Sequence, residues 1–159
     1  MTDVAQTNAA TEVFFSYAHE DEELKAKLED QLAILQRLGI VSSWDDRMID
    51  AGSEWRAEIE RRLNSAQVIL LLVSADFLAS DFCYGVEMQR AIERHDRGEA
   101  RVIPVILRAC LWKRAPFGKL QALPRDGKAI TSWANIDEAF SNVAQGIEKA
   151  VKNLAPPNP

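Results

Sequence analysis

The stretch "QVILLLVS" at residues 67–74 decides the fold, because every position from Val68 to Val73 is apolar. A strand with this pattern buries both of its faces, which is typical of parallel sheets covered by helices on both sides. The run is too short to cross a bilayer as a helix. It therefore predicts the central strand of an α/β domain.

Strand and helix patterns alternate on both sides of this central run. Short apolar segments predict further strands at residues 12–17, 40–44, 101–107 and 128–133. Helical periodicity marks residues 24–38, 55–66, 82–95 and 140–154. Together they predict an α/β fold: a flavodoxin-like, five-stranded parallel sheet in the order 2-1-3-4-5, with helices on both faces.

The two ends of the chain differ from its middle in composition. Residues 1–11 are small and polar, and the last residues read "LAPPNP". We expect one domain over residues 12–154, preceded by a flexible tail. Residues 155–159 are expected to form a proline-rich tail or a linker to a further domain.

The charge and cysteine pattern exclude several classes of partner. The net charge is −5, the pI is ≈ 5.1, and basic residues are interleaved with acidic ones, which argues against nucleic-acid binding. The N-terminal stretch has neither the basic nor the apolar region of a secretion signal. Cys83 and Cys110 have no C-x-x-C spacing, which indicates reduced thiols. We therefore expect a cytoplasmic protein that binds neither nucleic acid nor membrane.

Several cofactor-binding and catalytic motifs are absent. The loop after the first predicted strand, "SYAHED" at 16–21, contains no glycine, which excludes a dinucleotide-binding turn and a Walker A loop. Two histidines and two cysteines provide no zinc spacing, so no metal site is expected. Cys83 stands near the beginning of a predicted helix, where a thiol can be activated, but a small buried residue is the interpretation we favour.

The expected fold binds its ligands at the carboxyl ends of the strands, where strands 1 and 3 diverge. This rule selects residues 16–21, 44–53 and 74–87. Glu87 lies on the shoulder of the amphipathic helix predicted at 82–95, together with Arg90. The residues alone leave two interpretations open: a surface ion pair between Glu87 and Arg90, or a carboxylate at the rim of a pocket.

Four stretches resemble the signatures of Toll/interleukin-1 receptor (TIR) domains. The first is "VFFSYAHED" (13–21), an apolar strand followed by Ser, an aromatic residue and acids. The second is "WDDRMIDAGSEWRAEIERRLNSAQVILLLVSADFLAS" (44–80), which is similar to the BB loop, its helix and the third strand, with the marks Asp46, Ile49, Gly52, Trp55, Ile59 and Ser65. The others, "VIPVIL" (102–107) and "PFGKLQALP" (116–124), resemble the bacterial branch. The resemblance covers residues 12–153.

This resemblance implies a catalytic glutamate and a binding pocket. The NAD+-cleaving branch of the family carries a glutamate in its third helix within a W-C-x-x-E-like motif, and Glu87 of "CYGVE" (83–87) matches it. The family's Trp and Cys are replaced here, so the stacking ring would come from Tyr84 or Phe82. The residues that the resemblance assigns to the substrate or its surroundings are Ser16, Tyr17, Asp45, Asp46, Cys83 and Tyr84. The BB loop, which makes subunit contacts in the family, corresponds to Arg47, Met48, Ile49, Asp50, Ala51, Gly52 and Ser53.

The implied activity is that of an NAD+ glycohydrolase, with NAD+ as a substrate rather than a cofactor. The products would be nicotinamide and either ADP-ribose or a cyclic ADP-ribose isomer. Self-association into a dimer or filament, driven by a fused or associated sensor, would activate an effector of bacterial anti-phage defence. Two alternatives remain: a non-catalytic TIR module that engages other TIR domains, and a nucleoside deoxyribosyltransferase-like enzyme, which the BB-loop motif disfavours.

Overall fold

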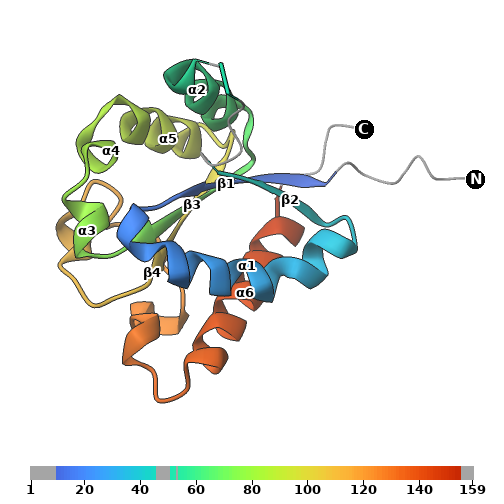
Figure 1. Ribbon diagram of the computed structural model, residues 1–159, viewed down its shortest axis with the longest axis vertical. Coiled ribbons are helices and arrows are strands. Elements are labelled where there is room, and N and C mark those ends of the chain that lie inside the picture. The colour runs from blue at the N-terminus through green and yellow to red at the C-terminus, as the bar shows by residue number, and fades with distance from the viewer. Residues whose placement is uncertain (1–9, 46–50, 53, 155–159) are drawn as a thin grey trace, which may run out of the picture.

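A four-stranded parallel sheet forms the centre of the protein (Figure 1). The computed structural model describes residues 10–45, 51–52 and 54–154. The strands lie in the order β2-β1-β3-β4, which confirms the predicted order for the first four strands. Their bounds are β1 (Thr11–Ser16), β2 (Val41–Trp44), β3 (Val68–Val73) and β4 (Arg101–Ile106).

Helices cover both faces of the sheet, as predicted (Figure 1). One face is covered by α1 (Glu22–Arg37) and α6 (Ile136–Lys152), and the other by α2 (Trp55–Ser65) and α5 (Val86–Asp96). Two short helices, α3 (Ala75–Leu78) and α4 (Asp81–Tyr84), follow β3, and 3₁₀ turns occur at His19–Asp21, Trp112–Arg114, Arg125–Gly127 and Ile130–Ser132. Among the described helices, none has the length and apolar character needed to span a membrane.

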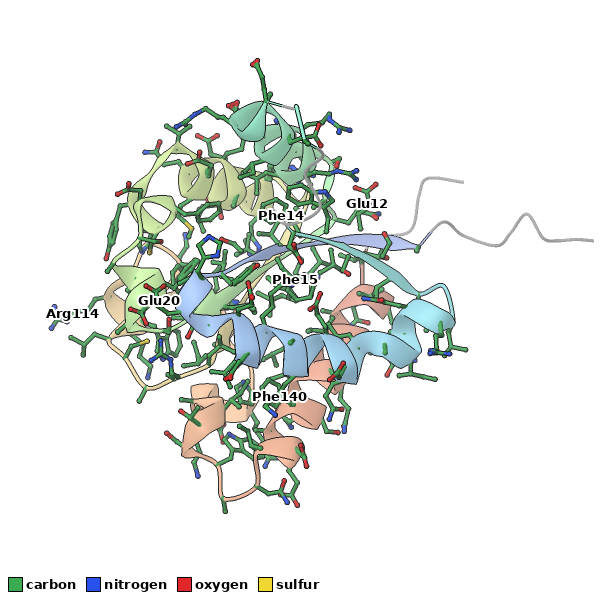
Figure 2. The ribbon with its side chains drawn as sticks, viewed as in Figure 1. Glu12, Phe14, Phe15, Glu20, Arg114 and Phe140 are labelled. Atoms are coloured by element: carbon green, nitrogen blue, oxygen red, sulfur yellow. The ribbon has the colours of Figure 1, made fainter. Side chains whose placement is uncertain are left out.

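The alternation of side chains along β3 divides the core into two clusters. Ile69, Leu71 and Val73 pack with the residues of α2 and α5, whereas the other side chains of β3 pack with α1 and α6. In β1 the same alternation places Phe14 in the first cluster and Phe15 in the second, on opposite faces of the sheet (Figure 2). The uninterrupted apolar run in the sequence therefore reflects burial on two faces.

The fifth predicted strand, at residues 128–133, differs in the structure. The chain there forms the 3₁₀ turn Ile130–Ser132, and its apolar pattern reflects the burial of Ala129 and Ile130 in the core. Earlier in the chain, Leu123 makes a single parallel bridge to Val105 of β4. The ladder does not extend from this bridge, because Pro104 has no N–H to donate and the Arg125 N–H donates to Asn142 Oδ1 instead of to β4.

The helix predicted at 82–95 is interrupted at Gly85, which separates α4 from α5. Gly85 has an extended backbone (φ −98°, ψ −170°), and a Cβ at this position would lie 2.8 Å from the Asp81 carbonyl oxygen. The helical count placed Tyr84 on the apolar face of this helix. That prediction is wrong, because the interruption turns Tyr84 away from the face, and the residue is 67% exposed. The interruption also places Glu87 in the first turn of α5.

Gly85→Ala should lower the free energy of unfolding, because the added methyl group collides with backbone rather than with a flexible side chain. Overpacking of this kind costs about 1–3 kcal/mol. Urea unfolding of the two proteins measures the difference. The neighbouring change Val86→Ala, at a side chain that is 71% exposed, should alter stability by about 0.5 kcal/mol or less. Equal stability of Gly85→Ala and the wild type would contradict the close contact.

Candidate functional site

A cavity of ≈ 190 Å³ opens at the carboxyl end of β1, beside β3. Ser16 and Tyr17 line it at the end of the strand, with His19 in the following turn. The other side is apolar and includes Ile59 of α2 and Phe82 of α4. Its position agrees with the rule that ligands of such sheets bind where the strand order reverses. Ser16, Tyr17 and Phe82, which the sequence singles out, are therefore brought together.

Glu87 lines a second cavity, of ≈ 200 Å³, between α2 and α5. Its carboxylate lies 3.6 Å from the guanidinium of Arg56 on α2, and the Glu87 side chain is 20% exposed. The predicted partner, Arg90, instead donates a hydrogen bond to Asn64 Oδ1 at 2.9 Å. The expected ion pair between Glu87 and Arg90 is therefore not formed, and Glu87 pairs with an arginine of another helix instead.

Helix α2 contributes a wall to both cavities. Ile59 lines the cavity at the end of β1, whereas Arg56 and Glu60 line the cavity that contains Glu87. The two cavities share no lining residue. Glu87 is also held at the N-terminal end of α5, where the helix dipole favours a negative charge. Helix α2 is therefore the element that the two cavities have in common.

Asp45 is buried in an ion pair rather than exposed at a pocket. Lys25 Nζ lies 2.5 Å from Asp45 Oδ2 and 3.0 Å from Glu29 Oε2. The Lys25 ammonium also lies over the rings of Phe15 and Tyr17, 5.3 and 5.0 Å from their centroids. Breaking a buried pair by removing one partner costs several kcal/mol, because a charge is left uncompensated. Asp45 therefore has a structural role: through Lys25, it links the end of β2 to the end of β1.

A second polar cluster, which the sequence reasoning missed, fixes the loops after β1, β3 and β4. The Ser74 hydroxyl donates to the buried carboxylate of Asp21 and accepts from the Phe77 N–H at 3.1 Å. Arg108 Nε donates to Asp21 at 3.0 Å, and Arg108 Nη2 donates to Asp76 at 2.5 Å. The hydrogen bond that Arg108 donates to Asp76, followed by the attraction of Asp21, raises the pKa of Arg108.

The sequence does contain a signal for this cluster. Ser74 and Arg108 each stand directly after a continuous apolar run, 68–73 and 102–107, and Asp21 lies in the loop after the first strand. Polar residues that follow adjacent parallel strands meet at one edge of the sheet. Applied to all polar residues at the strand ends, and not only to the acidic ones, this rule would have identified the cluster.

The two residues that replace the family's Trp and Cys have different environments. Cys83 is completely buried in the core next to α5, and desolvation raises the pKa of its thiol to about 11. The thiol is therefore protonated at neutral pH, which agrees with the interpretation of Cys83 as a packing residue. Tyr84 projects from the surface.

Asp46, predicted to lie near the substrate, and most of the predicted BB loop lie outside the described residues; these loop residues are Arg47, Met48, Ile49, Asp50 and Ser53. Ala51 and Gly52 are described, and both are exposed. Gly52 has a φ of +90°, a conformation that only glycine adopts readily, and a Cβ there would meet no atom within 4 Å. Within the ranges that the structure describes, no group of three or more His, Cys, Asp or Glu side chains could hold a metal ion.

Comparisons of structure and of sequence both match this chain to other proteins. The TIR domain of the Toll-related receptor TRR-2 from Hydra magnipapillata superposes with a TM-score of 0.62 at 18% identity, covering 89% of this chain and 98% of that domain. A protein of Sinorhizobium fredii, the uncharacterized protein y4lF, is 59% identical over 138 residues, which are 87% of this chain and 43% of that protein. The chain thus spans less than half the length of this relative. The family model described as the TIR domain matches residues 13–142, so the chain belongs to the TIR domain family.

Proposed function

We propose that this TIR domain cleaves the nicotinamide–ribose bond of NAD+ when copies of it associate, with Glu87 as the catalytic carboxylate. The observation that carries the proposal is that α2 lines two cavities, each of which contains one feature that the reaction needs. One is a strand-end cavity lined by Ser16, Tyr17 and Phe82, and the other is a partly buried carboxylate at the start of α5. An aromatic wall suits a nicotinamide or adenine ring, and a carboxylate suits the positive charge that develops on the ribose.

The chemistry needs only one carboxylate. The bond between ribose C1′ and the pyridinium nitrogen breaks with both electrons moving to nitrogen, so nicotinamide leaves as a neutral molecule and no general acid is required. This differs from O-glycoside hydrolysis, in which a second carboxyl group protonates the leaving oxygen. Glu87 would stabilise the oxocarbenium ion at C1′ electrostatically. Water then adds to C1′ and releases a proton, giving ADP-ribose, or the adenine of the same molecule captures C1′ and gives a cyclic isomer.

The ion pair with Arg56 supports a requirement for association. While Arg56 neutralises Glu87, the carboxylate stabilises a developing cation less well. Helix α2 directly follows the segment that resembles the BB loop, so a neighbouring copy that contacts this segment can displace α2. Such a displacement would separate Arg56 from Glu87 and join the two cavities. In the cell this activity would suit the effector of a bacterial anti-phage system, with a sensor in a further domain or a partner.

Glu87→Gln should reduce NAD+ turnover about 100-fold or more, because the amide keeps the size of the side chain and loses its charge. Release of nicotinamide by concentrated protein, with a crowding agent to promote association, measures the effect. Glu93→Gln, at an exposed position on the same helix, is the matched control and should keep full activity. If Glu87→Gln were fully active, the assignment of the site would fail while NAD+ cleavage itself survived.

Arg56→Gln should raise turnover, because it frees the Glu87 carboxylate from its counter-charge. The Arg56 side chain is 74% exposed, so the gain is that of a surface ion pair, about two- to fivefold. Initial rates at a protein concentration below that of full association provide the test. Arg61→Gln removes an exposed arginine of α2 that pairs with Glu58 instead, and it should leave the rate unchanged. A lower rate for Arg56→Gln would indicate that Arg56 binds substrate.

Gly52→Ala should weaken self-association and NAD+ turnover together. A non-glycine residue in a left-handed conformation costs about 1–2 kcal/mol, which the loop relieves by changing its backbone. Gly98→Ala is the control, since Gly98 has a similar φ of +74° and equally open surroundings but lies at the end of α5. Sedimentation velocity and nicotinamide release measure the two effects. Normal association of Gly52→Ala would remove this loop from the subunit contact.

A non-catalytic interaction module is the second candidate, because two large hydrophobic side chains close to Glu87 in the sequence are exposed. Tyr84 and Val86 are both large hydrophobic side chains that are mostly exposed. Such side chains suit a contact with another protein. Wild-type protein that self-associates and leaves NAD+ intact would favour this candidate and exclude the enzyme.

A further inference from the structure

A third cavity, of ≈ 450 Å³, lies along the outer edge of β4, away from the carboxyl ends of the strands. It extends from His95, near the end of α5, to Gly146 and Ala150 of α6. The first residues of β4 and the segment 119–123 form its other walls. Its volume falls within the range of small-molecule sites and exceeds those of the two cavities beside α2.

The edge of β4 at this cavity cannot accept another strand. The backbone N–H of Val102 donates to His95 Nδ1 at 3.0 Å. Pro104 has no N–H, and its carbonyl oxygen accepts from the Leu123 N–H at 2.9 Å. An added strand would therefore find no free donor along this part of the edge, and main-chain hydrogen bonds are what hold such a strand. The occupant of the cavity must be recognised by side chains.

The same hydrogen bond fixes the tautomer of His95. Because Nδ1 accepts a hydrogen bond, the proton of the neutral ring is on Nε2. His95 lines the cavity, and Nε2–H is the one donor that its ring has left to offer a ligand. The imidazole is thus preorganised as a hydrogen-bond donor.

Two cationic side chains line the cavity without a counter-charge from the described part of the chain. Among the described residues, neither Arg101 nor Lys119 has a carboxylate within ion-pair distance. The nearby acids are engaged elsewhere: Glu99 lies 3.6 Å from Arg94, and Glu148 lies 3.3 Å from Lys152. Unpaired cations beside a concave surface favour an anionic ligand.

The remaining walls are apolar, with Val102, Ile103 and Leu123 among the lining residues. Gly146 shapes this side, because a Cβ there would lie 2.6 Å from Leu123 Cδ2. The absence of that methyl group lets Leu123 pack against α6 while the adjacent space stays open. The cavity therefore combines an apolar wall with a positive rim, as sites for small organic anions do.

We propose that this cavity binds a small organic anion, with a phosphate or carboxylate at Arg101, Lys119 and His95 Nε2–H and an apolar or aromatic body against Val102 and Leu123. The site is separate from the strand-end cavity assigned to NAD+. It does not depend on whether this domain cleaves NAD+.

Phenyl phosphate is the probe, because it joins the anionic group to an aromatic ring. In ¹H–¹⁵N NMR spectra of the full chain, it should produce saturable shifts of the Val102, Ile103 and Ala150 amides, with a Kd below about 10 mM. Arg101→Gln combined with Lys119→Gln should weaken this binding at least about tenfold. Arg97→Gln, at an exposed arginine near the end of α5 that does not line the cavity, should retain the wild-type Kd.

Phenol and inorganic phosphate separate the two parts of the proposal. Each should bind at least about tenfold more weakly than phenyl phosphate, since each lacks one of the two recognised groups. Phenol binding as tightly would overturn the role of the cations, and inorganic phosphate binding as tightly would overturn the role of the apolar wall. The absence of saturable shifts, or unchanged binding by the double variant, would overturn the site itself.

Discussion

The architecture of the domain depends on the complete burial of β3, all six of whose side chains are shielded from solvent. Burial on two faces requires helices above and below the sheet and a strand on each side. β1 and β4 supply those strands, in parallel register with β3. Once β1 and β3 are neighbours, their carboxyl ends lie side by side, and the chain leaves them in different directions. The strand-end cavity is a direct result of that geometry.

The polar contacts at the strand ends and between α2 and α5 differ in how firmly they are held. The Lys25–Asp45 pair and the contacts of Asp21 with Ser74 and Arg108 join segments that are far apart in sequence. Each fixes a loop at a strand end, because a buried charge that lost its partner would remain uncompensated. The contact between Glu87 and Arg56 is longer and more exposed, and exposed pairs contribute about 1 kcal/mol or less. The proposed site would therefore combine loops held by buried contacts with one carboxylate whose partner is easily exchanged.

The sequence predicted most features that depend on local patterns. The apolar run of β3, the leucine repeat of α1 and the order of the first four strands followed from periodicity and the rules for parallel sheets. Contacts between distant segments could not be predicted in this way. The partner of Glu87 lies on another helix, and Asp45 is paired with Lys25 of α1, 20 residues earlier in the chain. The break at Gly85 was also missed, since the apolar spacing continues through it.

The two borders of the sheet limit how copies of this domain can join. β2 has only four residues, and the outer edge of β4 lacks free donors at Val102 and Pro104. A continuous sheet running from one copy to the next, as in amyloid-like fibres, is therefore disfavoured. If copies associate as proposed, their contacts would use side chains of helices and loops, and charged contacts of this kind weaken as the salt concentration rises. An assembly of this kind would dissociate when the local concentration falls, so a signal that depended on it would be reversible.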